Sequence, residues 1–306
     1  MLPHFNCLQL LGVRNSFQRV TVCEEPVDKS RIAMMDRATR EKNLAQLQKR
    51  VQECEARHGH PKPSALKAER AERLAQGMPL SNGASAATFA KIAKDREIRC
   101  QSRIRSELGP SGKPTHEERL GTDRCVPFFA GPFLYPKSEC GLLFNRSLEE
   151  AHRAEGACTP FDSGALIKVH AVSDPHEFMV EHEVPVPEHR ELLSEVLARL
   201  FNDPWDYLDG KDPRSSSHFG LTKGDARRYT HEVRIPDAVG ILDHVMAVFV
   251  TSSRVADPSI MAYLVECEKR NIDYVPVPAG HSGNFQKLSR SSTNYIRVLL
   301  SEEASV

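Results

Sequence analysis

The first third of the chain carries apolar residues at the spacing of an amphipathic helix. In "NLAQLQKRVQEC", Leu44, Leu47, Val51 and Cys54 recur every three or four positions, which places them on one face of a helix. The segments "SALKAERAERLAQG" and "SAATFAKIAKDREIRCQSRIRSELG" are rich in strong helix formers, and the glycines at 77 and 109 are helix stops. The pattern predicts helices over residues 43–54, 64–77 and 85–109.

Beyond residue 121 the pattern changes to short apolar runs rich in β-branched and aromatic residues. Such runs predict strands, and they cover residues 125–131, 140–144, 164–170, 231–235, 244–250 and 272–278. Helical periodicity returns over residues 147–156, 187–201 and 257–271, the last with Asp257 as N-cap and Pro258 in its first turn. The chain is therefore predicted to be α+β, with a mainly antiparallel sheet preceded by helices.

Composition divides the chain into four parts. Residues 1–33 differ in composition from the rest of the chain, and Met34–Met35 would make a natural start, so we interpret 1–33 as a poorly ordered leader or the product of an upstream start. Residues 34–108 form a helical segment, here called the basic arm. The Pro-, Gly- and Ser-rich stretch 109–121 is typical of a linker. Residues 122–306 are expected to form the α+β body, separable from the arm.

Charge is unevenly distributed, although 41 basic residues balance 41 acidic ones overall. Residues 34–107 hold 16 Lys and Arg against 9 Asp and Glu, whereas residues 108–306 hold 21 against 29. Such a separation indicates that the basic arm meets an acidic partner. The candidates are a nucleic acid, another protein and the chain's own body, and a plain solvated helix surface is the alternative.

No segment has the properties of a targeting or membrane element. No apolar run approaches the roughly 18 residues that a membrane span needs, and the N-terminal stretch lacks the basic start and cleavage site of a signal peptide. The eight cysteines form no CxxC pair and are dispersed through a chain too long to depend on disulfides. We expect reduced thiols, no membrane association and a cytoplasmic location.

Several catalytic signatures are absent, and one cluster of ligand-type residues is present. The sequence contains no GxxxxGK[ST], no GxSxG, no HExxH and no GxGxxG after a strand, so P-loop, α/β-hydrolase, zincin and Rossmann sites lack support. The stretch "HEFMVEHE" has a spacing that matches no known metal frame. We predict no metal site and keep a metal-dependent hydrolase as a minor alternative; its ligands would be His176, Glu177, Glu181, His182 and Glu183.

A turn before one apolar run is a candidate binding element. In "TPFDSGALI", Asp162 and Ser163 can face a polar ligand, and Gly164 tolerates a positive φ. A plain Asx turn entering a strand explains the same residues equally well.

A second candidate is the carboxylate of Glu232, which opens a predicted strand after Arg227, Arg228 and Tyr229. Neighbouring cations can keep such a carboxylate ionised and aimed into a cleft. The alternative is an exposed charge that protects an edge strand from aggregation.

Four stretches, taken in order, resemble the later part of the ADP-ribosyltransferase toxins that modify DNA: "RCVPFFAGPFLYP", "GLLFNRSLEEA", "FDSG" and "RRYTHEVRIPDAVGILDHVMAVFV". In those proteins a V-P-F-Y-F strand precedes a proline-rich turn and an apolar strand, and an Arg-rich segment later leads to the strand with the catalytic glutamate. The resemblance covers about residues 117–252. The upstream His/Asn segment that grips nicotinamide has no clear counterpart here.

The resemblance implies that NAD is the substrate and that Glu232 is the catalyst. It also implies that Arg124 is aimed at the pyrophosphate, where a planar guanidinium can bind two oxygens. Tyr229 or Phe133 would stack on nicotinamide or on an acceptor base. The residues expected to bind the cofactor are thus Arg124, Asp162, Ser163, Arg228 and Tyr229.

Our leading interpretation is an NAD-dependent ADP-ribosyltransferase-like enzyme that modifies a nucleic-acid or protein acceptor, as a bacterial toxin or phage-defence component. Cleavage of the nicotinamide–ribose bond passes through an oxocarbenium-like state, which one carboxylate can stabilise. The basic arm would contact nucleic acid or an acidic protein. The alternative is a non-enzymatic interaction or regulatory protein with a helical docking arm.

Overall fold

The computed structural model describes residues 36–57, 59, 61–108, 116–135, 138–168, 172–211, 213, 230–278 and 284–302. The helices are α1 (Arg37–Arg57), α2 (Ala65–Gly77), α3 (Ala86–Asp95), α4 (Gln101–Leu108), α5 (His116–Leu120), α6 (Ser147–Ala151), α7 (Ser163–Lys168), α8 (Pro175–Glu181), α9 (His189–Leu200), η2 (Pro204–Tyr207), η4 (Ser252–Arg254), α10 (Pro258–Lys269) and α11 (Asn284–Glu302). Helices α2, α3, α8 and α10 begin at a side-chain cap; Asp257, for example, accepts hydrogen bonds from the backbone N–H groups of Ser259 and Ile260.

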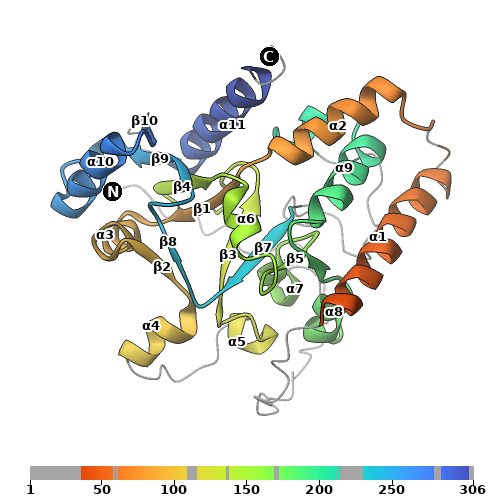
Figure 1. Cartoon of the computed structure of the whole chain (residues 1–306), viewed down its shortest axis with the longest axis horizontal. Coiled ribbons are helices and arrows are strands. Elements are labelled where there is room, and N and C mark those ends of the chain that lie inside the picture. The colour runs from red at the N-terminus through yellow and green to blue at the C-terminus, as the bar shows by residue number, and fades with distance from the viewer. Residues whose placement is uncertain are drawn as a thin grey trace, which may run out of the picture.

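An eight-stranded sheet runs through the molecule in the order β10-β9-β4-β1-β3-β7-β5-β6, and β2 pairs separately with β8 (Figure 1). Only the β10–β9 pair of these two sheets is parallel, so the predicted α+β class with a mainly antiparallel sheet is confirmed. The strands are β1 (Leu80–Ala84), β2 (Glu97–Arg99), β3 (Cys125–Ala130), β4 (Cys140–Phe144), β5 (Ala157–Thr159), β6 (Val184–Pro185), β7 (Glu232–Pro236), β8 (Ala238–Gly240), β9 (Val245–Thr251) and β10 (Asp273–Val277).

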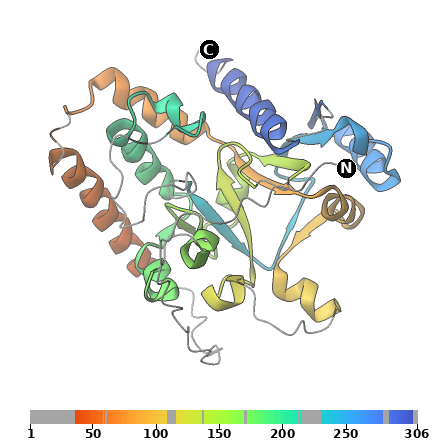
Figure 2. The same ribbon diagram turned by 180° about the vertical axis from the view of Figure 1, so that it is seen from behind.

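The basic arm is part of the body, so the predicted division between them is wrong. Its strand β1 lies inside the sheet, hydrogen-bonded to β3 on one side and β4 on the other. Its helices α1 and α2 pack on α9, and α3 packs on α10; Figures 1 and 2 show α1, α2 and α9 together on one side of the molecule. Helix α9 lies within the helix predicted over residues 187–201, and its apolar residues Leu192, Leu193, Val196, Leu197 and Leu200 are buried.

The charge of the basic arm is largely matched by acidic residues of the chain itself. Arg96 contacts Glu266 at 2.8 Å and Arg37 contacts Glu188 at 2.6 Å. Arg99, Arg103 and Arg105 also reach carboxylates, those of Asp95 and Glu97, of Asp237 and of Glu118. Arg37, Arg96 and Arg103 thus meet carboxylates of the body, whereas Arg99 and Arg105 meet carboxylates of the arm and of the linker stretch.

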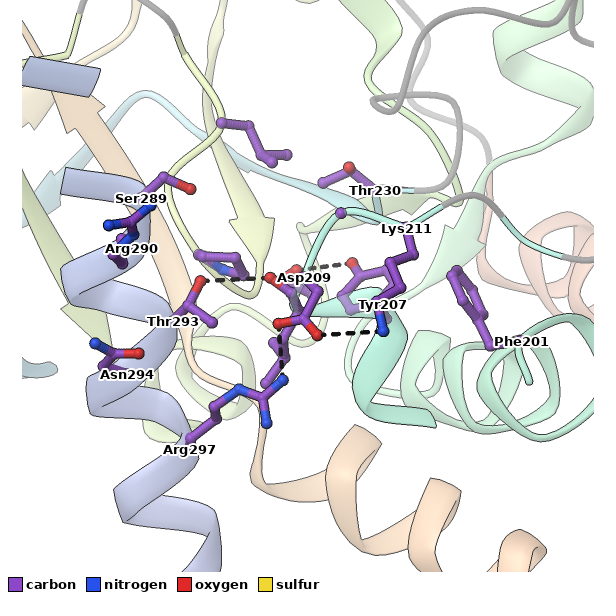
Figure 3. A pocket seen from close by; sticks show the side chains of 15 residues that line it. Phe201, Tyr207, Asp209, Lys211, Thr230, Ser289, Arg290, Thr293, Asn294 and Arg297 are labelled. Atoms are coloured by element: carbon purple, nitrogen blue, oxygen red, sulfur yellow. Dashed lines mark hydrogen bonds and ion pairs between the residues drawn. The ribbon is translucent and has the colours of Figure 1, made fainter. Parts of the chain in front are cut away.

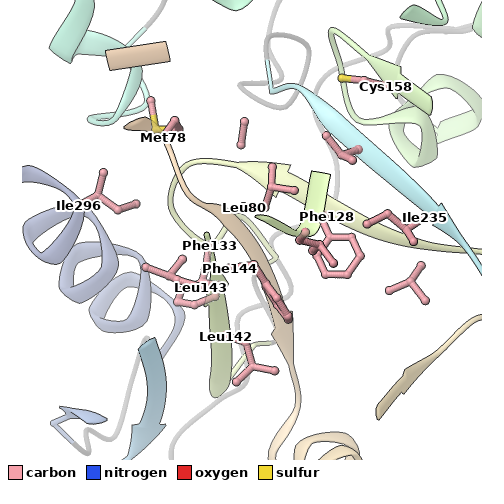
Figure 4. Packing of buried hydrophobic residues seen from close by; sticks show 14 of the residues in the cluster. Met78, Leu80, Phe128, Phe133, Leu142, Leu143, Phe144, Cys158, Ile235 and Ile296 are labelled. Atoms are coloured by element: carbon pink, nitrogen blue, oxygen red, sulfur yellow. The ribbon is translucent and has the colours of Figure 1, made fainter. Parts of the chain in front are cut away.

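Aromatic and aliphatic side chains of the central strands form the core (Figure 4). Phe128 of β3 and Phe144 of β4 meet edge to face, with ring centroids 5.1 Å apart. The ring of Phe133 lies over Gly141, where a Cβ would come within 2.3 Å of it. Glycine at 141 is therefore required. Since Phe133 is fully buried there, its predicted stacking on a ligand is wrong.

One predicted strand is a helix. Residues 164–170 were expected to be extended, but α7 covers Ser163–Lys168, because a short apolar run fits either structure and tertiary contacts decide between them. No helix among the described residues has both the length and the apolar character needed to cross a membrane. Cysteines 100, 125, 140, 158 and 267 are free thiols.

Candidate active site around Glu232

Strand β7 places Glu232 in the interior of the sheet. The residue pairs with Phe129 of β3 on one side and with Thr159 of β5 on the other, and β6 lies beyond β5. Only 3% of Glu232 is exposed. The alternative of an exposed charge on an edge strand is therefore wrong for this position.

The carboxylate of Glu232 is held by the first residue of α7. One oxygen accepts a hydrogen bond from the backbone N–H of Ser163, and the other lies 2.9 Å from the Ser163 hydroxyl. Asp162 is buried next to it, with 2% exposure. The structure thus brings together three of the predicted site residues, two of them from the "FDSG" turn.

Burial and a like charge make the proton affinity of Glu232 high. Desolvation raises the pKa of Glu232 to about 7, with the Asp162 carboxylate acting in the same direction; Arg234 and the Ser163 hydrogen bonds partly oppose them. A carboxyl group with such a pKa titrates in the physiological range. This is the property expected of a functional acid–base or electrostatic group.

The cation nearest along the strand is engaged elsewhere. Arg234 follows Glu232 by two residues and so lies on the same face of β7. Its guanidinium donates to Glu183 Oε1 at 2.7 Å, and Arg40 of α1 lies 3.7 Å from the other oxygen of Glu183. Asn43 of α1 donates to the Glu183 carbonyl at 2.9 Å. Through Arg40 and Asn43, helix α1 of the basic arm therefore helps to hold Glu183 and Arg234 in place on this face of β7.

The opposite face of β7 carries a second buried polar cluster. His231 Nδ1 lies 3.3 Å from His189 Nδ1 of α9. His189 Nε2 contacts Glu149 of α6, and Arg190 donates its Nε to the same carboxylate at 2.7 Å. With Cys158 of β5, the two histidines form a group of potential metal ligands. Sequence reasoning missed it because Cys158, His189 and His231 lie too far apart in the chain to form a short motif.

The other predicted cofactor residues are not brought to Glu232. Arg124 is exposed, and its carbonyl accepts from the backbone N–H of Asp237, at the end of β7 opposite Glu232. Five residue steps along a strand span roughly 17 Å, so the expected approach of Arg124 to the same site is not observed. Arg228 and Tyr229 lie outside the described residues.

The stretch "HEFMVEHE" forms helix α8 and the turn after it rather than a metal site. His182 stacks on Phe178, with centroids 4.2 Å apart, and contacts the Phe178 carbonyl. Glu183 is paired with Arg234. Within the described part of the chain, the grouping of metal-ligand types falls on Cys158, His189 and His231 instead. The geometry therefore gives the metal-dependent hydrolase alternative no support.

A cavity of about 620 Å³ opens between α11 and the turn after η2 (Figure 3). Thr230, two residues before Glu232, lines it, but Glu232 does not. Arg297 is neutralised by Asp209 at 2.7 Å, whereas Arg290 contacts no carboxylate among the described residues. The wall of α11 can therefore accept an anion at Arg290.

Comparison with known proteins gives a weak structural likeness. No protein-family model matches the chain, and no curated protein matches it. DarT of Thermus sp. 2.9 in complex with NAD+ shares 12% identity over 67% of this chain and 96% of that chain, with a TM-score of 0.40. The same protein with carba-NAD+ (10% identity, 66% and 95% coverage) and with ADP-ribosylated ssDNA (11%, 68% and 96%) gives TM-scores of 0.37. These values are too low to establish a shared fold, and the chain is assigned to no family from them.

Proposed function

We propose that the protein is an NAD-dependent ADP-ribosyltransferase-like enzyme in which Glu232 is the catalytic carboxylate. The observation that carries the proposal is the Glu232 carboxylate itself, buried at the start of an interior strand, fixed by Ser163 and adjacent to Asp162. Burial beside a second carboxyl group raises the pKa of Glu232, and shifts of this kind cluster at functional sites. The sequence resemblance assigns the catalytic role to the same residue.

The proposed reaction breaks one bond and forms one. The bond between nicotinamide nitrogen and ribose C1′ breaks, its electron pair leaves with nicotinamide, and C1′ becomes oxocarbenium-like. A nitrogen or oxygen of the acceptor then bonds to C1′ and releases a proton. A desolvated carboxylate stabilises the developing positive charge more strongly than an exposed one, because the local dielectric is low.

Ser163 has a positioning role in this proposal. Its two hydrogen bonds hold both oxygens of Glu232, so the carboxylate need not reorganise as charge develops. Arg228 and Tyr229 precede the strand directly, and we retain them as residues that bind NAD. Arg124 is not retained as the pyrophosphate ligand, because it lies at the far end of β7.

For the acceptor we propose a nucleic acid. The cavity that begins at Thr230 presents Arg290, Ser289 and Asn294 from α11, a set of donors suited to phosphate and base edges. The arginines of the basic arm at 96, 99, 103 and 105 already contact carboxylates, so contact through the cavity is favoured over contact through the arm. A toxin or phage-defence role and a cytoplasmic location, the latter in keeping with the free thiols, complete the proposal.

Label transfer from NAD tests the activity. The protein is incubated with NAD labelled in its adenylate and, separately, with single-stranded DNA, duplex DNA, RNA and proteins. We expect label on a nucleic acid, lost in Glu232→Gln and kept in Glu155→Gln, a matched change at a side chain that is 61% exposed. If no pool becomes labelled and NAD is not consumed, the protein is the non-enzymatic interaction protein of the alternative.

The acceptor contact has a separate test. Arg290→Glu should reduce label transfer to nucleic acid by roughly tenfold or more, as for loss of a charge-assisted phosphate contact, while nicotinamide release without acceptor is unchanged. Lys94→Glu on the exposed side of α3 is the control for a general change of charge. Equal loss in both variants would assign the effect to net charge rather than to the cavity.

A further inference from the structure

The cluster behind Glu232 has the composition and spacing of a metal site. Cys158, His189 and His231 are completely buried, and they offer one ligand atom each within 4.8 Å of one another. They come from β5, α9 and the residue before β7, so the fold rather than a local motif brings them together. Cys158 is labelled in Figure 4 at the edge of the core.

The hydrogen bonds of His189 leave its Nδ1 available as a ligand. The Glu149 carboxylate lies against His189 Nε2 and also binds Arg190, and an ionised carboxylate only accepts, so the proton of His189 resides on Nε2. Its Nδ1 then carries a lone pair directed at His231 Nδ1, 3.3 Å away. A metal ion would bind through this lone pair, because a coordinating imidazole nitrogen must carry no proton.

The tautomer of His231 is not fixed by a second bond. Its Nε2 is buried and has no hydrogen-bond partner. If the proton lies on Nδ1, the ring donates to His189 and leaves a bare nitrogen unsatisfied. If the proton lies on Nε2, two lone pairs face each other across 3.3 Å, an arrangement that a bound cation would stabilise.

The distance between the two ring nitrogens matches a shared metal ion. Zinc binds imidazole nitrogen at about 2.0–2.1 Å in a tetrahedral arrangement, which puts two such nitrogens about 3.3 Å apart. We propose that Cys158, His189 and His231 are ligands of one zinc ion. Glu149, which contacts His189 Nε2, would then be the carboxylate that orients a zinc-bound histidine, as is common in zinc sites.

The ion would join three elements behind the candidate active site. It would tie β5 and the start of β7 to α9, directly beneath the backbone that carries Glu232. Since none of the three side chains is exposed, the ion would be taken up during folding and would contribute to stability. This role does not depend on the reaction proposed for Glu232.

Metal content of the full chain is the first test. Protein purified in chelator-treated buffer should contain about one zinc ion per chain, measured by elemental analysis. Protein unfolded with chelator and refolded with Co2+ should show the thiolate-to-cobalt charge-transfer band and the intense visible bands of a tetrahedral site. Absence of stoichiometric metal after purification, together with absence of those bands after refolding, would overturn the proposal.

Matched variants locate the ion. Cys158→Ala should remove the charge-transfer band and lower metal content by roughly tenfold, whereas Cys140→Ala, a change at another fully buried free thiol, should alter neither. Should Cys158→Ala fail to fold, the charge-transfer band of wild type still reports thiolate ligation by itself. A band that survives Cys158→Ala would also contradict the proposal.

Discussion

On one face of β7, Glu232 and Asp162 are two buried carboxyl groups whose nearby cation, Arg234, is already paired with Glu183. On the other face, the carboxylate of Glu149 is matched by His189 and Arg190. The pKa of Glu149 shows the result: burial would raise it, but these two partners hold it below its ordinary value. The pKa of Glu232 is raised to about 7. The ion pairs of Glu149 therefore outweigh the effect of its burial, whereas burial prevails in the pKa of Glu232.

The two buried carboxyl groups differ in role: Glu149 is structural, and Glu232 is proposed to be functional. A paired carboxylate such as Glu149 fixes neighbouring elements, and Arg190 extends that by donating to the carbonyls of Ala75, Gln76 and Met78 at the end of α2. A carboxyl group whose pKa is raised by burial, such as Glu232, lowers stability when it is ionised, and in the proposed reaction it would stabilise the developing positive charge. The same strand thus carries a structural anchor on one face and the proposed catalytic carboxylate on the other.

Removing residues 34–78 should have the largest effect on this comparison. The deletion takes Arg40 from the Glu232 face and all three carbonyl partners of Arg190 from the Glu149 face, and it exposes the apolar surface that α1 and α2 cover on α9. We expect a protein without cooperative thermal unfolding, measured by circular dichroism. A sharp thermal transition in the truncated protein would show instead that the arm is separable from the body, as the sequence predicts.

Removing one carboxylate charge on each face should have the next largest effect. Glu149→Gln and Glu183→Gln each leave a buried arginine without its counter-charge, which costs about 3–5 kcal/mol of unfolding free energy. Glu155→Gln, at an exposed position, should stay within about 0.5 kcal/mol. Urea denaturation measures all three. If Glu183→Gln lowers the unfolding free energy no more than Glu155→Gln does, the Glu183–Arg234 ion pair does not stabilise this face of β7.

The pH dependence of stability should distinguish the two faces with a smaller effect. The pKa of Glu232 lies above its ordinary value of 4.5, so the folded state holds this proton more tightly than the unfolded state does. Unfolding free energy should therefore fall as pH rises from about 4.5 to about 7, by something on the order of 2–3 kcal/mol. Glu232→Gln should lose this decline and be the more stable protein at pH 8. A decline that persists in the variant would assign it to another group.

Elements of the fold could be predicted from the sequence where apolar runs or capping residues mark them. The apolar runs of β3, β4 and β9 and the capped helix α10 stand where the pattern placed them. Strand β1 could not be found this way, because Ser81, Asn82 and Gly83 lack the apolar character of a central strand. The polar side chains are accommodated there by bonds to backbone: Ser81 to the Phe129 carbonyl and Asn82 to the Pro127 carbonyl.

The candidate site was predicted only where its residues are close in sequence or covered by the resemblance. Asp162, Ser163 and Glu232 were found because the turn and the strand resemble known segments. The pairing of His189 with His231 depends on how α9 packs against β7, and no local pattern reports that packing. The uneven charge of the chain was visible in the sequence, but only the structure shows that its two parts neutralise each other.

Release of nicotinamide from NAD without an acceptor tests the central claim most directly, because it needs Glu232 but no partner. We predict that wild-type activity rises as pH increases through about 7, the pKa of Glu232, and that Glu232→Gln lowers it by roughly 10² or more. In Asp162→Asn the rise should move to lower pH, since a neighbouring negative charge is removed. A folded Glu232→Gln protein that releases nicotinamide at the wild-type rate would contradict the account.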